Sequence, residues 1–412
     1  MIDYYETKTH PITRLMVWHA YKEVKANGKA AGVDGVTMEQ YAKDLNGNLY
    51  KLWNRLTSGS YFPSDVREKK IEKKGGEGYR SLGIPTVEDK IAQQVVRAYL
   101  EPKAELSFHA DSYGYRPGRH AHHAIAKARE RCHFKSLQWV LDLDISKFFD
   151  TVDHELMLKG VAYYTKEKWV LMYIERWLKA GVLKEDGARE EREKGTPQGG
   201  VLSPLLSNIY LHIAFDKWME KKFPFIQFER YCDDIIVHCA SENQAYYLKQ
   251  GIAWRLEKCK LQLNQEKTKV VYCKNPWRRD KHPNQSFDFL GYTFCARMSF
   301  TKSGWMMLFS PEMSRTSKNA VMKRIRQWRT KTFNGSIQQM SKGINPMLTG
   351  WINYYCAFNK WRTEIIWHRL NKRLIQWVCW KYKKHVRQAV RWLKDVYRKQ
   401  PTLFAHWKIA HF

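Results

Sequence analysis

The sequence predicts an α+β fold in which an antiparallel sheet precedes an all-helical C-terminal region. Two acids, Asp233 and Asp234, lie between two short β-prone runs, which favours a tight hairpin carrying both at its tip. A second segment alternates apolar and acidic residues, so a strand there would put Asp142 and Asp144 on one face. After about residue 305 the sequence becomes basic and helix-like throughout, which predicts the helical region.

Size and charge narrow the class of protein. The chain has 412 residues with 44% hydrophobic residues, enough for two or three packed subdomains. Its 71 Lys and Arg against 41 Asp and Glu give a net charge of +30, which favours nucleic acid as partner, with an anionic membrane surface second. No long uncharged apolar stretch and no signal-like N-terminus is present, so we expect a cytoplasmic protein without a membrane partner. The eight cysteines form no CxxC pair, which argues against a zinc finger.

The other elements follow from periodicity and turn residues. A glycine-rich turn at Gly75–Gly78 inside residues 66–84 predicts a hairpin rich in lysine and arginine. A turn at 31–35 separates the first two helices. Helical spacing predicts helices over 12–26, 38–56, 89–99, 120–131, 153–180, 203–220 and 243–258, and β-prone runs predict short strands near 270–273 and 287–294.

The C-terminal region concentrates the positive charge. Residues 301–412 hold 23 basic and three acidic residues, together with nine of the 17 Trp. Basic and aromatic residues interleave at helical spacing over 321–328 and 365–396. One interpretation is amphipathic helices with a Trp core face and a phosphate-binding Lys/Arg face. The alternative is a solvated charged face over structural Trp, which does not explain the scarcity of acids.

The paired acids have a chemical interpretation. Asp is a common turn former, so the pair alone could be an ordinary turn. Carboxylates on the strands of a core-forming sheet are costly unless they bind cations or strong donors. Three acids from two strands can hold two Mg²⁺ ions, the arrangement of nucleotide polymerases. The first hypothesis is therefore the palm of a metal-dependent polymerase.

Eight motifs in order resemble the group II intron-encoded reverse transcriptase/maturase family. They are Arg80-Ser-Leu-Gly-Ile-Pro-Thr86, Ser112-Tyr-Gly-Tyr-Arg-Pro-Gly-Arg119, Asp144-Ile-Ser-Lys-Phe-Phe-Asp150, Gly195-Thr-Pro-Gln-Gly-Gly-Val-Leu-Ser-Pro204, Tyr231-Cys-Asp-Asp234, Leu263-Asn-Gln-Glu-Lys-Thr-Lys269, Phe287-Asp-Phe-Leu-Gly-Tyr292 and Gly350-Trp-Ile-Asn-Tyr-Tyr355. The resemblance implies a right-hand polymerase fold, with fingers and palm over 1–305, a helical thumb or X domain over 306–375 and a short basic DNA-binding-like segment over 376–412. The family's HNH endonuclease domain is missing, so second-strand cleavage is not expected.

The resemblance assigns the metal site. Asp144, Asp233 and Asp234 are the expected catalytic residues, and the same three with Ile145 are the expected metal ligands. Two Mg²⁺ ions are implied, and Mn²⁺ can substitute. The family has an aromatic residue five positions after the first catalytic Asp. Phe149 meets this spacing from Asp144, so Asp144 rather than Asp142 is the expected first catalytic Asp. Asp142 is then expected in a supporting role and Asp150 in a structural one.

The nucleotide-binding residues are also implied. Lys74 and Arg80 would neutralise the triphosphate, and Lys73 could replace Lys74 because the turn's alignment is open. Phe149 resembles the steric gate that selects deoxynucleotides; the alternative is a core Phe. Gln198 and Gly199 would pack under the nascent base pair. Lys267 and Lys269 are candidates to protonate the leaving pyrophosphate.

The remaining implied residues contact the template and primer. Tyr113, Arg116 and Arg119 are expected on the template backbone, and Leu290, Gly291 and Tyr292 in the primer grip. The expected partners are an RNA template such as structured intron RNA, a DNA or RNA primer, target DNA and dNTPs.

Three functions stay open. The leading hypothesis is an RNA-templated DNA polymerase that also assists intron splicing and retrohoming. Cys232 stands where many intron-encoded members have Ala, which keeps open a host-adopted enzyme of DNA repair or phage defence. A non-catalytic splicing cofactor is the third, although the intact acids argue against decay.

Overall fold

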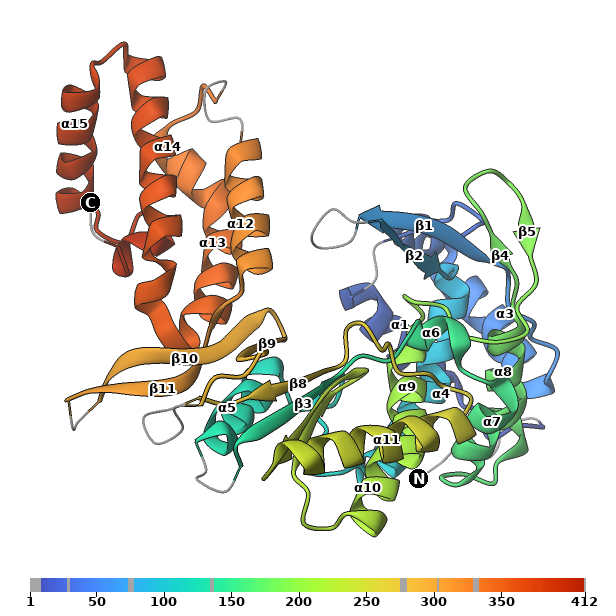
Figure 1. The fold of residues 1–412 in the computed structure, drawn as a ribbon. Coiled ribbons are helices and arrows are strands. Elements are labelled where there is room, and N and C mark those ends of the chain that lie inside the picture. The colour runs from blue at the N-terminus through green and yellow to red at the C-terminus, as the bar shows by residue number, and fades with distance from the viewer. Residues whose placement is uncertain are drawn as a thin grey trace. The chain divides into compact units, whose positions relative to one another are not determined.

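The structure is a computed structural model that describes residues 9–27, 30–72, 78–133, 137–274, 280–301, 304–328 and 333–410. The chain divides into two compact units (Figure 1). The first comprises residues 1–124 and 139–270, and the second comprises 125–138 and 271–412. The expected boundaries at 305 and 375 stay predictions.

The first unit begins with helices. They are α1 (Arg14–Asn27), α2 (Met38–Tyr41), α3 (Leu45–Ser58) and α4 (Val87–Glu105). The single helix expected over 38–56 is wrong, because a 3-10 turn at Ala42–Asp44 separates α2 from α3. Asp44 leaves helical geometry and its side chain accepts a hydrogen bond from the Gly47 amide, so a new helix begins there.

A small sheet follows. Its order is β2 (Tyr79–Ile84), β1 (Val66–Glu72), β4 (Val182–Leu183) and β5 (Arg189–Glu190). The antiparallel β1–β2 pair confirms the hairpin predicted over 66–84.

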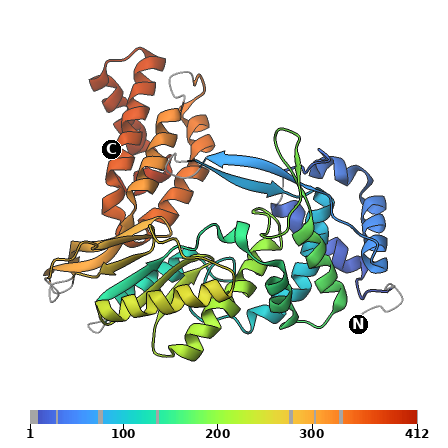
Figure 2. The same ribbon diagram turned by 45° about the vertical axis from the view of Figure 1, so that its right-hand side comes forward.

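The central sheet carries both acidic segments. Its order is β6 (Phe228–Tyr231), β7 (Asp234–Cys239), β3 (Trp139–Leu143) and β8 (Lys269–Tyr272), with the division between the units falling inside β8. Helix α11 (Glu242–Lys258) packs against β3 and β7 (Figure 2). Because β7 is buried from Ile235 to Cys239, its neighbours fix the place of the Asp233-Asp234 turn at its start.

The remaining helices follow in chain order, and the division between the two units falls inside the first of them, α5. They are α5 (Ala121–Cys132), α6 (Phe148–Thr151), α7 (His154–Ala162), α8 (Lys168–Lys179), α9 (Ser203–Leu211) and α10 (Lys217–Lys222), with a π-helical turn (His212–Asp216) joining the last two.

In the part of the chain that the structure describes, the second unit combines a three-stranded sheet with the last residues of α5 and four further helices. The sheet has the order β11 (Gly304–Met313), β10 (Tyr292–Thr301), β9 (Ser286–Phe289). The helices are α12 (Arg315–Gln327), α13 (Ile337–Asn359), α14 (Glu364–Tyr382) and α15 (Val386–Lys399), with 3-10 turns at Lys360–Thr363 and Ala405–Lys408. The expectation of helices alone after 305 is wrong, because β11 pairs with β10 along its whole length before α12 begins.

One hydrophobic core joins the four helices. It includes Trp367 and Trp377 of α14, Leu393 of α15 and Trp407 beyond it, all buried. Residues on both sides of position 376 therefore share one core. This confirms that the Trp residues of α14 are largely structural, as the core-face interpretation requires. None of the described helices is both long and apolar enough to cross a membrane.

Candidate active site

Strands β6 and β7 form the predicted hairpin with a two-residue turn. Tyr231 pairs with Asp234, so Cys232 and Asp233 make the turn. Asp233 is at the tip, whereas Asp234 is the first residue of β7, a refinement of the expectation that both lie at the tip. Cys232 has a positive φ of 58° and is buried, so the turn's backbone is strained for a residue other than glycine.

Strand β3 brings the third acid to the same place. Asp142 pairs with Ile236 and Leu143 with Ile235. Continuing that register by one residue puts Asp144 opposite Asp234, and residues opposite each other on antiparallel strands share a face of the sheet. The two acidic segments therefore meet as the sequence predicted.

The charges of neighbouring carboxylates add to the pKa shifts of Asp233 and Asp234. Burial raises the pKa of Asp234 to about 7, with the charges of Asp233 and Asp144 adding to the shift and Arg80 opposing it. Burial also raises the pKa of Asp233, and Asp144 again adds to it. Asp234 nevertheless retains exposed surface, so solvent and ions reach it. Crowded like charges are a feature of functional sites, because a bound cation relieves them.

The donor chemistry of this site fits a divalent cation. Carboxylate oxygens are the ligands that Mg²⁺ prefers. Among the described residues, no group of three or more His, Cys, Asp and Glu side chains is drawn together closely enough to enclose a metal ion in this conformation. Mutual repulsion of uncompensated carboxylates opposes such a closed arrangement. Ile145, the fourth expected ligand, bridges to Leu263 through its backbone and has a buried side chain.

A buried polar network supports the hairpin from within, and sequence reasoning missed it. The Arg230 guanidinium donates to both oxygens of Asp216, to Asn208 Oδ1 at 3.0 Å and to the backbone oxygen of Cys232 at 3.3 Å. Burial alone would raise the pKa of Asp216, but the charge of Arg230 and hydrogen bonds from His212 and Arg230 outweigh burial and lower it. The sequence signal that could have found this network is a charged residue inside a β-prone run, one position before Tyr231.

A loop wraps the outside of the same turn. The Tyr113 amide donates to the Arg230 oxygen at 2.8 Å, and Asn208 Nδ2 donates to the Gly114 oxygen at 2.7 Å. A Cβ on Gly114 would lie 2.6 Å from the Cys232 amide nitrogen. Glycine is needed there because two backbones approach closely.

Of the residues expected to bind the triphosphate, the structure describes Arg80 but neither Lys73 nor Lys74. Arg80 lies on β2 and is exposed, and its charge offsets part of the rise in the pKa values of Asp233 and Asp234. Lys74 and Lys73 lie outside the described residues. The Gln198 oxygen accepts from the Gly83 amide at 2.7 Å, and Gly199 has a φ of 116° beside the Gly83 oxygen. The loop containing Gln198 and Gly199 is therefore docked on β2, the strand of Arg80.

Phe149, Lys267 and Lys269 are the remaining residues expected around the nucleotide and the pyrophosphate. Phe149 is half-buried, its ring packs edge-on against Phe148 and its backbone oxygen accepts from the Thr196 amide at 2.7 Å, so the ring keeps a solvent-facing part. Lys267 Nζ lies 3.8 Å from Asp144 Oδ2. Lys269 is exposed at the start of β8.

The template-binding expectation fails for Arg116. Its side chain is only 3% exposed and donates to Glu105, to the His109 oxygen at 2.7 Å and to the Ser112 oxygen at 2.6 Å. With its donors committed inside the protein, Arg116 is a structural residue, which corrects the prediction.

The neighbours of Arg116 are also engaged in the loop. Tyr113 is buried and donates to Asp111 Oδ1 at 3.0 Å. Arg119 is half-buried, donates to the Ala110 oxygen and lies over the Tyr113 ring. Template contact by these two side chains stays a prediction.

The expected primer grip is a second tight hairpin, in the second unit. Leu290 and Gly291 form the turn between β9 and β10, both with positive φ. The Leu290 oxygen accepts from Tyr354 Oη at 2.8 Å, and the Gly291 oxygen accepts from the Ser314 amide at 3.0 Å. Tyr292 is buried and donates to the Tyr354 oxygen. The loop is thus held by its backbone, and only Leu290 and Gly291 retain accessible surface.

A palm-like antiparallel sheet with three facing acids, next to a basic hairpin, defines the class of nucleotide-polymerising enzymes with a right-hand fold. Comparison with known proteins resolves the class. Residues 71–294 match the family described as "Reverse transcriptase (RNA-dependent DNA polymerase)", and residues 318–397 match "Group II intron, maturase-specific domain". The chain belongs to the reverse transcriptase family of RNA-directed DNA polymerases, and within it to the group II intron type. This family depends on divalent metal and acts on nucleic acid.

Individual proteins similar to this chain agree with the family assignment. Protein YkfC of Escherichia coli (strain K12) is 31% identical over 304 residues, covering 65% of this chain and 76% of YkfC. The group II intron-encoded protein LtrA of Lactococcus lactis subsp. cremoris is 36% identical over 200 residues, covering 48% of this chain and 33% of LtrA. The match thus spans only about a third of LtrA's length. Telomerase from Candida albicans, solved in complex with a fragment of telomeric RNA, has a TM-score of 0.46 at 12% identity over 91% of this chain and 68% of that chain, a likeness too low to support an argument.

Proposed function

We propose that this chain copies RNA into DNA at the site formed by Asp144, Asp233 and Asp234. The observation that carries the proposal is the register of β3 and β7, which, continued by one residue, sets Asp144 opposite Asp234 beside the Asp233 turn. These carboxylates would hold two Mg²⁺ ions, with Mn²⁺ as a substitute and Ile145 as an additional ligand. When bound, such ions activate the primer 3′-hydroxyl and neutralise the triphosphate.

The chain's own residues supply orientation and charge. Arg80, exposed beside the acids, would bind the triphosphate of the incoming dNTP, together with Lys74. Phe149 would lie under the sugar and exclude a 2′-hydroxyl. Gln198 and Gly199, held on β2 through Gly83, would pack under the new base pair.

Proton transfer to pyrophosphate falls to Lys267 rather than Lys269. Lys267 Nζ is 3.8 Å from Asp144 Oδ2, so it reaches the site where the triphosphate would lie. An ammonium there can donate a proton to the leaving oxygen as the bond to the α-phosphate breaks.

The second unit supports binding of structured RNA. It contains the residues that match the maturase-specific domain, and residues 301–412 carry 23 basic against three acidic side chains. We assign to this region binding of intron RNA that assists splicing and retrohoming, with target DNA contacted by residues 376–412. A host role in DNA repair or phage defence is the second candidate, favoured by Cys232 in the turn.

Primer extension tests the polymerase. The assay uses an RNA template with an annealed DNA primer, dNTPs and Mg²⁺, and compares the wild type with Asp233→Ala/Asp234→Ala. Asp150→Asn is the matched control, because Asp150 is an exposed acid near Phe149 and outside the ligand set. We expect extension by the wild type and the control and none by the double variant.

Other results would count against the proposal. Extension that survives in the double variant places the chemistry elsewhere. No extension by the wild type, with tight RNA binding retained, would favour the splicing cofactor. Intron RNA domains flanking the gene would favour intron mobility, and their absence would favour the host role.

A further inference from the structure

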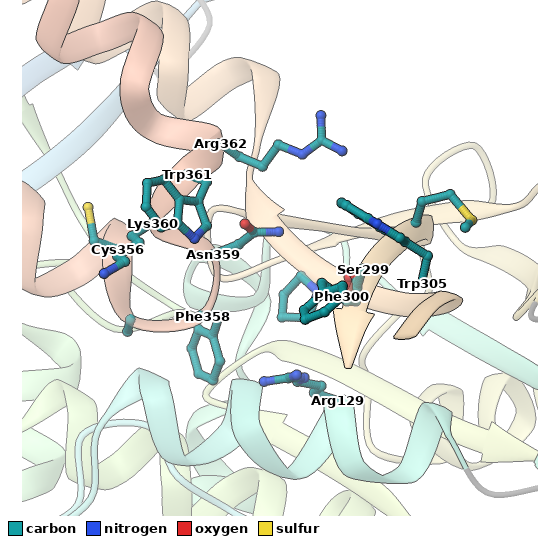
Figure 3. A pocket seen from close by; sticks show the side chains of 14 residues that line it. Arg129, Ser299, Phe300, Trp305, Cys356, Phe358, Asn359, Lys360, Trp361 and Arg362 are labelled. Carbon is teal, nitrogen blue, oxygen red and sulfur yellow. The ribbon is translucent and has the colours of Figure 1, made fainter. Parts of the chain in front are cut away.

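The second unit contains a cavity that the polymerase site does not use. It has a volume of about 810 Å³ and lies between the β10–β11 hairpin, α5 and the turn that follows α13 (Figure 3). That volume falls in the range of about 300–1,000 Å³ typical of ligand sites. All its lining residues belong to the second unit.

Three of the aromatic side chains that line this cavity are largely exposed to solvent. Phe300, Trp305 and Trp361 are 75%, 69% and 70% exposed. Phe300 and Trp305 pair across the hairpin with ring centroids 5.6 Å apart, and Trp361 comes from the opposite wall. Exposed large rings cost free energy unless a partner covers them. Their flat faces fit other flat, unsaturated groups.

The cations of the cavity indicate the charge of the ligand. Arg129, Lys360 and Arg362 line it, and none of its lining residues in the described part of the chain is acidic. Arg362 is also 3.7 Å from Glu312, so part of its charge is compensated. Lys360 Nζ lies 5.0 Å from the centre of the Trp361 ring, which puts a cation beside a stacking surface. The ligand is therefore anionic as well as flat.

We propose that this cavity binds an unpaired nucleotide of single-stranded RNA. The base would stack on Trp361 or on the Phe300–Trp305 pair, and the adjoining phosphates would lie on Arg129 and Lys360. A base in the interior of a duplex has both faces stacked on its neighbours, so the cavity favours single-stranded over duplex RNA. Ser299 and Asn359 add neutral polar groups to the lining that can bond a 2′-hydroxyl, which favours RNA over DNA.

Binding measurements test the proposal without relying on polymerisation. We would titrate the full chain with a fluorescent unstructured RNA, DNA of the same sequence and a duplex RNA. The test variants are Trp361→Ala and Phe300→Ala/Trp305→Ala, whose side chains are exposed and do not belong to the core. Trp254→Ala, a 58% exposed aromatic on α11, is the matched control.

We expect each test variant to bind single-stranded RNA about five- to 150-fold more weakly, which is the loss of one stacked base at about 1–3 kcal/mol. Duplex binding and the Trp254→Ala variant should stay at wild-type affinity. Replacing Arg129 or Lys360 by Gln should reduce the slope of log K against log salt by about 0.7 for each phosphate that the variant no longer neutralises. Photocrosslinking of RNA containing 5-bromouridine should label peptides with Trp361 or Trp305.

Three outcomes would overturn the assignment. One is wild-type affinity for single-stranded RNA in both aromatic variants, and another is an equal decrease in affinity for single-stranded and duplex RNA. The third is an equal decrease for RNA and DNA of one sequence, because the site would then not select RNA. Circular dichroism of the variants excludes unfolding as the cause.

Discussion

Arg230 and Asp216 form a fully buried ion pair beneath the turn that carries Asp233. Nε donates to Oδ1 at 2.7 Å and Nη2 to Oδ2 at 2.6 Å, while Nη1 reaches the Cys232 oxygen at 3.3 Å. The π-helical turn brings Asp216 to this position, and π-turns often occur at functional sites. The pair therefore connects a helix junction to the backbone of the turn that carries Asp233.

Replacing one member of this pair should destabilise the protein more than replacing both members. Arg230→Met or Asp216→Leu leaves one buried charge without its partner, at a cost of about 3–5 kcal/mol. The double variant leaves neither charge, so its free energy of unfolding should exceed that of each single variant. Urea unfolding of the four proteins measures this coupling. Additive decreases in the free energy of unfolding would show that the two side chains do not act as a pair.

Gly114→Ala should lower activity while the fold is kept. The added Cβ would lie 2.6 Å from the Cys232 nitrogen, so the turn must shift and Asp233 with it. Because a displacement of catalytic groups by about 1 Å can cost about 10²-fold, we expect kcat to fall by up to that factor. Gly350→Ala in α13 is the control, because its Cβ would meet nothing within 4 Å. Equal kcat for Gly114→Ala and the wild type in primer extension would refute close packing against the turn.

Lys267→Ala and Lys269→Ala should separate the two proton-donor candidates. Removal of a general acid costs about 10²–10⁴-fold in rate. We expect that decrease for Lys267→Ala, since Nζ lies 3.8 Å from Asp144, and a much smaller one for Lys269→Ala. Single-turnover incorporation rates of the two variants show which lysine donates the proton, and a solvent isotope effect is the second readout. A larger decrease for Lys269→Ala would reverse the assignment.

Phe149→Val should relax the choice of sugar. The smaller side chain leaves room for a 2′-hydroxyl, so kcat/KM for ribonucleotides should rise relative to deoxynucleotides by about tenfold or more, a gain of at least about 1.4 kcal/mol in relative transition-state binding. Half-burial of Phe149 beside Phe148 predicts only modest destabilisation. Competing incorporation of dCTP and CTP measures the ratio. An unchanged ratio would leave Phe149 as a core residue.

Acid should destabilise the helical part of the second unit through His406. Burial lowers the pKa of His406 to about 3 from its usual 6.5, and Nε2 donates to Asn371 Oδ1 at 2.7 Å as the neutral ring does. Below pH 6.5 the unfolded chain takes up a proton that the folded chain does not, so stability falls by about 1.4 kcal/mol per pH unit down to about pH 3.

The control for this pH dependence is His406→Gln, which keeps a donor for Asn371 and does not titrate. Thermal unfolding between about pH 4 and 8 should show a smaller slope for the variant. Parallel slopes for wild type and variant would assign the acid sensitivity to other groups.

By itself the sequence determined the chemistry of the site and the local structure around it. Alternation along Val140–Ile145 and the β-prone runs around Asp233 and Asp234 were enough to predict an acidic strand, a hairpin and their meeting in one sheet. These features depend on periodicity and turn residues, which are local properties.

Tertiary structure decided which polar side chains are buried. Arg116 looks like a template ligand in sequence, yet Glu105 and the backbone of the same loop occupy its donors. Arg230 looks like an exposed strand residue, yet Asp216 and Asn208 enclose it. In these cases the side chains that accept from the buried charge lie 11 to 22 residues away along the chain, and no local pattern records them.

Contacts between residues far apart in the sequence also explain why the sequence predicted neither β11 nor the cavity in the second unit. β11 exists because β10 pairs with it over ten residues, although its segment reads as part of a helical region. Phe300, Trp305 and Trp361 are brought to one cavity only by that hairpin and the turn that follows α13. Composition predicted a basic, aromatic-rich region, and long-range packing chose which of its aromatic rings face solvent.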